Sequence, residues 1–161
     1  MVDAGVMVRG SFADVIVSNV GRPIGFYRTL PGLEVLVDHV WYAELGVDGT
    51  TLVAFVEAGH ETVPVAAGRR PSGVLVSFEV DDAAAHAAIA EATACVFVVA
   101  LTSELGQRHF MVADPDGAIV DVIERVALTT ADRRRLVRLR RAGALGRVVA
   151  WQMASSRSGS V

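Results

Sequence analysis

The sequence predicts an α+β fold of two tandem βαβββ units, with curved mixed sheets around a cleft and helices on the convex side. Three observations support this prediction. Residues 12–19 align with residues 75–82 at an offset of 63. An Asp-Gly pair followed by an apolar strand ending in Glu occurs at residues 48–57 and again at 116–124, at offsets of 68 and 67. Beyond residue 128 the pattern ends, and a basic C-terminal tail begins that we expect to be helical.

The first unit is predicted over about residues 10–57. Alternating β-branched residues predict a strand over residues 12–18. Gly21-Arg22-Pro23 opens a helix over residues 24–30, because proline is favoured in the first helical turn, and Pro31-Gly32 ends it. Three strands then follow, the last two joined by an Asp48-Gly49 hairpin turn: residues 34–38, 41–47 and 51–57.

A loop over residues 58–73, rich in Gly and Pro, connects this unit to the second, which is predicted over about residues 73–125. The second unit begins with a strand at residues 74–80. Asp81-Asp82 then caps a helix over the Ala-rich residues 83–92. The remaining strands are expected at residues 95–100, 108–113 and 118–124, the last two around Asp114-Pro115-Asp116-Gly117.

The composition indicates one domain over residues 1–128, followed by the tail over residues 129–161. The chain has 161 residues, of which 52% are hydrophobic and 20% charged, so it can bury a full core. Cys95 is the only cysteine, which excludes an internal disulfide and a cysteine-based metal cluster. No apolar run has the 18 or more residues of a membrane span, and no basic-then-apolar secretory signal is visible. We therefore expect a cytoplasmic protein that does not contact membranes.

The charge is divided sharply between these two parts. Residues 1–128 carry a net charge of −10, and residues 129–161 carry +7 from eight arginines and Asp132. All positive side chains are arginine, since the chain has no lysine. Three interpretations of the tail stay open: a helix that packs on its own acidic body or on a dimer mate, a disordered extension, and a nucleic-acid-binding arm. The third is the least favoured, because the acidic body repels phosphates.

Two segments resemble the vicinal oxygen chelate superfamily, which contains glyoxalases, extradiol dioxygenases, fosfomycin resistance proteins and bleomycin resistance proteins. Residues 19–35, which include Phe26-Tyr27 and Pro31-Gly32, resemble its first helix and following strand. Residues 106–124 resemble its C-terminal hairpin, through Gly106-Gln107-Arg108-His109-Phe110, Asp114-Pro115-Asp116-Gly117 and Asp121-Val122-Ile123-Glu124. The resemblance covers about residues 10–125, implies the paired βαβββ fold, and is closest in kind to the metal-free bleomycin resistance branch.

The resemblance also implies where a divalent metal would be held, namely on the first and last strands of each unit. In this chain the four positions fall on Phe12, Ala54, Leu75 and Asp121, three of which have no ligating atom. The histidines, at positions 39, 60, 86 and 109, have no metal-ligand spacing. We therefore expect no metal and no other cofactor.

Strand alternation predicts which side chains face the cleft. Beside apolar residues, the expected ligand-binding set contains carboxylates and an aromatic wall, which suit a ligand that carries positive charge or many hydroxyl groups. His109, in the strand before the last turn, is included as a cleft-facing residue. The full set is Phe12, Asp14, Trp41, Leu75, Ser77, Glu79, His109 and Asp121.

The resulting hypothesis is a metal-free small-molecule binding protein. Its specific version is sequestration of an antibiotic-like cationic or polyhydroxylated compound, as the bleomycin resistance branch does in clefts shared across a homodimer. The main alternative is a metal-dependent lyase, isomerase or dioxygenase of the same superfamily. We assign no catalytic residue, because no nucleophile–base arrangement is visible, although Asp121 remains a conceivable general base. A third class is a ligand-responsive regulator that uses the basic tail.

Overall fold

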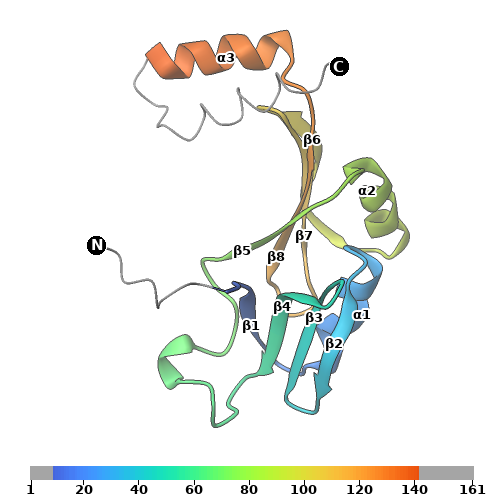
Figure 1. Ribbon diagram of the computed structural model, residues 1–161, viewed down its shortest axis with the longest axis vertical. Coiled ribbons are helices and arrows are strands. Elements are labelled where there is room, and N and C mark those ends of the chain that lie inside the picture. Colours follow the sequence, from blue (N-terminus) through green and yellow to red (C-terminus); the bar gives the residue numbers. More distant parts are fainter. Residues whose placement is uncertain (1–8, 142–161) are drawn as a thin grey trace.

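A computed structural model describes residues 9–141 of the chain. It contains two units of the same order, strand, helix and three strands, joined by a short 3-10 helix η1 (Val65–Ala67) and followed by a third α-helix (Figure 1). The first unit comprises β1 (Ala13–Val17), α1 (Gly21–Thr29), β2 (Glu34–His39), β3 (Tyr42–Val47) and β4 (Thr50–Glu57). The second comprises β5 (Leu75–Glu79), α2 (Ala83–Ala92), β6 (Val96–Glu104), β7 (Gln107–Ala113) and β8 (Ile119–Arg125), and α3 (Thr130–Arg141) comes after it.

Each unit forms its own four-stranded mixed sheet. The strand orders are β1-β4-β3-β2 and β5-β8-β7-β6, and in both sheets the first and last strands of the unit are parallel neighbours. The register is also repeated, because Asp14 pairs with Ala54 in the first sheet as Ser77 pairs with Asp121 in the second. The predicted fold class of two tandem βαβββ units with a C-terminal helix is confirmed.

One hydrophobic core lies between the sheets and the helices. Valines alternate along the strands, so that Val15 and Val17 of β1, and Val120 and Val122 of β8, are buried on the same side as α1 and α2. Tyr27 of α1 is at the centre of this core. Its ring lies 4.8 Å from that of Phe55 and 6.0 Å from that of Phe78, one from each unit.

The turn between β7 and β8 of the second unit forms hydrogen bonds with residues of the first unit. Asp116 Oδ1 accepts hydrogen bonds from the backbone N–H of Ser18 (3.0 Å) and from its hydroxyl (2.6 Å). Arg22 of α1 donates to the carbonyl oxygen of Pro115 at 3.0 Å. The Asp-Pro-Asp-Gly sequence therefore forms a turn and also makes hydrogen bonds that connect the second unit to the first.

The observed element bounds differ from the predicted ones mainly at β6. This strand runs to Glu104, whereas the sequence indicated its end at Ala100. It continues because Leu105 and Gly106 form a tight turn with positive φ values of 52° and 82°, which lets β7 pair back along its whole length. The helix α2 is capped as predicted, by Asp82 Oδ1 accepting from the Ala85 N–H at 3.0 Å.

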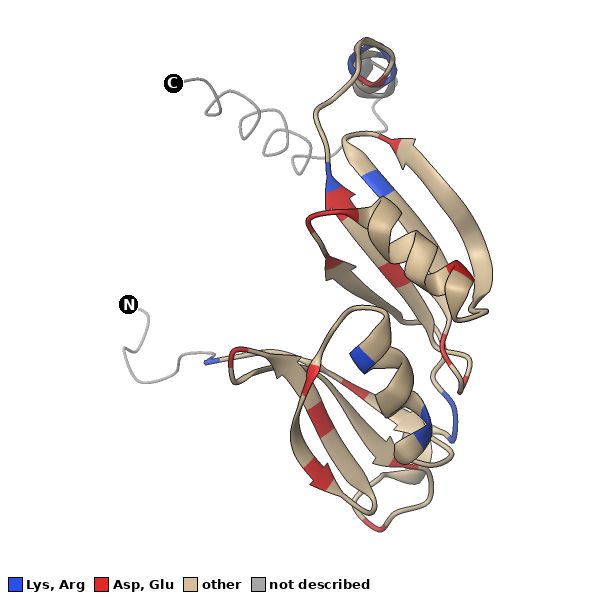
Figure 2. Cartoon of the chain, turned by 90° about the vertical axis from the view of Figure 1, so that its right-hand side faces the viewer, with Lys and Arg blue, Asp and Glu red and all other residues tan. Residues whose placement is uncertain are grey.

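The described part of the tail, up to residue 141, is the helix α3, and residues 142–161 lie outside the described residues. Thr129 and Asp132 exchange reciprocal hydrogen bonds in the manner of a capping box, which fixes where the helix begins. α3 lies at one end of the molecule, and several of its residues are arginines (Figure 2). Within residues 9–141, every helix is too short or too polar to cross a lipid bilayer.

Candidate functional site

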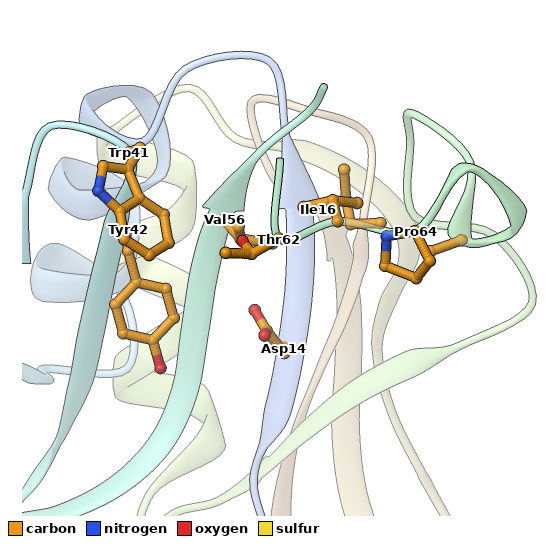
Figure 3. A pocket seen from close by; sticks show the side chains of 9 residues that line it. Asp14, Ile16, Trp41, Tyr42, Val56, Thr62 and Pro64 are labelled. Carbon is orange, nitrogen blue, oxygen red and sulfur yellow. The ribbon is translucent and has the colours of Figure 1, made fainter. Parts of the chain in front are cut away.

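The first sheet carries a pocket on the face opposite its helix. The pocket has a volume of about 400 Å³ and is lined by strand residues and by the segment that connects the two units. The strands and the turn before β3 present one carboxylate, two aromatic rings and two aliphatic side chains, and the connecting segment closes one side (Figure 3). The lining residues are Asp14, Ile16, Trp41, Tyr42, Val56, Thr62, Val63, Pro64 and Ala67.

Strand pairing brings two carboxylates to the pocket region. Asp14 of β1 and Glu44 of β3 are both register partners of Ala54 in β4, so they flank this small residue on the same face. Ala54, whose side chain is a single methyl group, lies between them and is fully buried. In Figure 3 the Asp14 carboxylate points into the space between β1 and the side chains of Trp41 and Tyr42.

Glu44 is held in place by two hydroxyl groups. Tyr42 donates a hydrogen bond of 2.9 Å to Glu44 Oε1, and Thr51 donates one of 2.6 Å to Oε2. Both oxygens of Glu44 are therefore engaged. Among the described residues, Asp14 has no such hydrogen-bond donor, which leaves its oxygens available to a ligand.

The electrostatics of the pocket follow from these contacts. Burial raises the pKa of Asp14 above its ordinary value, and the negative charge of Glu44 raises it further. Burial, together with the hydrogen bond and negative charge of Glu44, raises the pKa of Tyr42 to about 12. Tyr42 is thus a neutral donor at physiological pH, and the charge in the pocket is negative.

An aromatic wall closes the pocket opposite Asp14. Trp41 stacks on His60 of the connecting segment, with ring centroids 3.9 Å apart and planes 3° apart, and its ring is 5.6 Å from that of Tyr42. His60 is fixed in turn by a hydrogen bond of 2.9 Å between its Nδ1 and the hydroxyl of Thr62. The indole ring is therefore held in one orientation across the pocket from the Asp14 carboxylate, an arrangement that attracts cations.

The second sheet places a different group of predicted residues together. His109 Nδ1 lies 3.0 Å from Asp121 Oδ1, and both side chains are buried. Ser77 is the register partner of Asp121 on the neighbouring strand. Glu79, at the end of β5, instead forms an exposed ion pair of 2.9 Å with Arg125.

Phe12 and Leu75 occupy equivalent places at or just before the first strands, and both are exposed, to 48% and 53%. Of the eight predicted ligand-binding residues, only Asp14 and Trp41 line the described pocket. His109, Asp121 and Ser77 form a cluster on the other sheet. Ligand binding by any of the eight residues stays a prediction.

The residues at the superfamily's metal positions do not fit a divalent metal. Ala54 is buried and pairs with Asp14 across the strands, Phe12 and Leu75 offer no donor atom, and Asp121 is engaged by His109. Within residues 9–141, no group of three or more His, Cys, Asp or Glu side chains gathers in a way that would hold a metal ion.

The sequence reasoning missed Glu44 and the contribution of the connecting segment. Alternation along β3 could have found Glu44, since it lies two residues beyond Tyr42 and so shares its face. Nothing in the sequence indicated where the segment over residues 58–73 folds. Three of the lining residues that it contributes are apolar, namely Val63, Pro64 and Ala67.

Comparisons with known proteins agree with this fold. No protein-family model matches the chain. No curated protein matches it either. Among solved structures, a glyoxalase/bleomycin resistance protein/dioxygenase from Nocardioides is 18% identical, with a TM-score of 0.58, over 78% of this chain and 89% of that one.

Two further structures are similar to the same extent. TioX from Micromonospora is 21% identical over 73% of this chain and 100% of that chain, with a TM-score of 0.58. A virulence protein from Salmonella typhimurium is 16% identical over 75% of this chain and 99% of that chain, with a TM-score of 0.62. At these levels of identity the likeness establishes the fold, which this chain shares with the three structures.

Proposed function

We propose that this protein binds a small organic cation in the pocket of the first sheet, without a metal. The single observation that carries the proposal is the pairing of Asp14 with the rigid Trp41–His60 stack across one cavity of about 400 Å³. A carboxylate with a raised pKa gains most from a cation beside it, because the cation stabilises its charged form.

The size and lining of the pocket support an antibiotic-like ligand. Pockets for drug-sized molecules typically have volumes of about 300–1,000 Å³, with mostly apolar walls and few polar groups. Here Ile16, Val56 and Pro64 supply the apolar surface, and the acidic and aromatic side chains supply orientation. Sequestration of a cationic or polyhydroxylated antibiotic is the specific version of the proposal, and it is supported by the likeness of the fold to the glyoxalase/bleomycin resistance protein/dioxygenase from Nocardioides.

The proposal includes two further points. Two copies associate, as in the bleomycin resistance branch that the sequence resembles, and the protein acts in the cytoplasm. The rival function, a metal-dependent lyase, isomerase or dioxygenase, needs a donor set that is not found among the described residues.

Metal content of freshly purified protein, before and after incubation with Zn, Ni, Mn and Fe(II), separates the two functions first. Near-stoichiometric metal would refute metal-free binding. The second step is thermal shift and calorimetry with bleomycin and kanamycin as cationic probes and chloramphenicol as a neutral one. We expect stabilisation by a cationic probe only, because the pocket offers a carboxylate and aromatic faces rather than a positive charge.

Two matched variants assign such binding to the pocket. Asp14→Asn removes the charge that faces the cation and should weaken binding by roughly tenfold or more, as loss of a charge-assisted contact does. Asp48→Asn removes the same charge from an exposed turn, where φ is 49° and asparagine is well tolerated, so it should leave the affinity unchanged. If the two variants bind the cationic probe with equal affinity, Asp14 is not part of the binding site.

A further inference from the structure

The two sides of α3 have different surroundings. On one side the helix contacts the tip of the β6–β7 hairpin, where Asp132 Oδ1 accepts from the Leu105 N–H at 3.0 Å and Arg135 forms an ion pair of 3.1 Å with Glu104. The other side is exposed. At helical spacings of three and four residues it presents a surface that we call the arginine face, formed by Thr130, Arg133, Arg134, Val137 and Arg138.

The arginine face borders a hollow of about 430 Å³. Val137 is 45% exposed at its centre, with the three arginines around it. This is the composition of a protein-binding surface, an apolar centre with arginine at the rim. The chain after residue 141 adds Arg147 and Arg157 but no acidic residue, so it supplies no charge to neutralise the face.

A complementary surface lies on the turn between β2 and β3. Val40 is 91% exposed there, and the exposed Asp38 lies two residues before it. Glu57 lies beside this turn, because its backbone N–H donates to the carbonyl oxygen of Trp41 at 2.9 Å. Neither acid forms an ion pair among the described residues. We call Asp38, Val40 and Glu57 the acidic tip.

The arginine face and the acidic tip lie at opposite ends of the molecule's long axis, so they cannot meet within one chain (Figure 1). We propose that the arginine face of α3 binds the acidic tip of a second copy, with Val40 seated beside Val137 and the acids facing the arginines. In an antiparallel two-fold dimer, the arginine face of each copy contacts the acidic tip of the other. The two equivalent contacts form together, and the assembly is closed at two copies.

Charge complementarity selects this occupant over a nucleic acid. Residues 1–128 carry a net charge of −10, which repels phosphates at any site on the body but attracts a +7 tail from another copy. The ion pair between Arg135 and Glu104 already shows this helix binding a carboxylate of its own body. The inference rests on the proposed association of two copies, but the contact does not involve Asp14 and so does not depend on ligand binding in the pocket.

The test is the molar mass of the full chain by sedimentation velocity across a concentration and salt series. We expect a dimer at micromolar concentration whose dissociation constant rises with salt, because salt screens exposed charges. The triple variant Arg133→Glu, Arg134→Glu, Arg138→Glu should weaken the dimer by roughly a hundredfold, since each contact turns from attraction to repulsion in both copies. The matched control, Arg28→Glu, Arg69→Glu, Arg70→Glu, changes the net charge equally at other exposed sites and should leave the dimer unchanged.

Two further variants keep the test decisive if the triple variant affects helix α3. Val40→Asp lies on the other side of the contact, far from α3, and should also weaken the dimer. A photoreactive phenylalanine analogue at position 137 should cross-link to the partner within residues 34–42, as mapped by mass spectrometry. A monomer at every concentration, a dimer that survives both the triple variant and Val40→Asp, cross-links elsewhere, or an arginine-dependent shift of duplex DNA without dimerisation would each overturn the proposal.

Discussion

The phenol of Tyr27 donates a buried hydrogen bond of 3.1 Å to Asp114 Oδ2, and this bond joins α1 of the first unit to the β7–β8 turn of the second. Asp114 Oδ1 meanwhile accepts from the backbone N–H groups of Asp116 and Ala118, at 2.9 and 2.8 Å. Burial raises the pKa of Asp114, although its three hydrogen bonds oppose the change, and burial next to this carboxylate raises the pKa of Tyr27 far above its ordinary value. The turn and the helix are therefore stabilised by the same acid.

Tyr27→Phe should lower the free energy of unfolding by about 1–3 kcal/mol, because it leaves a buried carboxylate oxygen without its donor. Urea denaturation measures this loss, and the slope with denaturant should stay unchanged if only stability is affected. Tyr42→Phe is the comparison, since its hydroxyl is only partly buried and Glu44 retains Thr51. A smaller loss at position 27 than at position 42 would contradict the assigned role.

Binding of a cationic probe should strengthen as pH rises through the raised pKa of Asp14. The probe prefers the charged carboxylate, and burial and Glu44 keep that carboxylate protonated to a higher pH than an ordinary aspartate. Isothermal calorimetry between pH 4 and pH 7, with bleomycin as the probe, should show proton release on binding in the acidic part of this range. Asp14→Asn should flatten the profile, and a wild-type profile that is already flat would exclude Asp14 as the titrating group.

Gly46→Ala should be strongly destabilising, by about 2 kcal/mol or more, because the added Cβ would overlap the backbone carbonyl of Thr50 at the bulge between β3 and β4. Gly25→Ala is the matched control. Position 25 lies inside α1 with open space around it, so alanine there should stabilise by about 0.5–1 kcal/mol. Thermal unfolding of both variants would show melting temperatures shifted in opposite directions, and a neutral Gly46→Ala would refute the close approach.

Asp132→Asn should loosen the start of α3. Its hydrogen bonds to Thr129 and to the Leu105 N–H hold the pKa of Asp132 below the ordinary value, so the charged form favours the docked helix. This stabilisation is present above the pKa of an unfolded aspartate and is lost as the pH falls through the lowered folded value. Amide hydrogen exchange over residues 130–138 should be faster in the variant at neutral pH. Asp81→Asn, which removes an exposed acid elsewhere, should leave the exchange rates of α3 unchanged.

Much of the fold follows from local sequence signals. The alternation in β1 and β5, Asp82 before α2, and the Asp48-Gly49 turn each specify local geometry, and their repetition specifies two equivalent units. The end of β6 did not follow, because Leu105 is a non-glycine residue with positive φ and does not carry the usual signal of a turn.

The candidate site was predicted only in part, for reasons of register and long-range folding. Alternation predicts that Asp14 and Ile16 share a face, but the partners of that face depend on how β3 and β4 pair, which brings Glu44 beside Asp14. The pairing of His109 with Asp121 likewise depends on the β7–β8 register, which places them diagonally across two strands. The course of residues 58–73 is set by packing rather than by local preference, so their side chains were missed.

The repeated register has an evolutionary consequence. Positions 14, 42 and 54 of the first sheet correspond to positions 77, 109 and 121 of the second, yet they hold Asp, Tyr and Ala in one unit and Ser, His and Asp in the other. A symmetric ancestor would have had identical residues at both sets of positions. The apolar core lies on the other side of each sheet, so these exchanges leave the residues of the core unchanged. Each half was thus free to acquire its own chemistry, and one duplicated scaffold now presents two unlike surfaces.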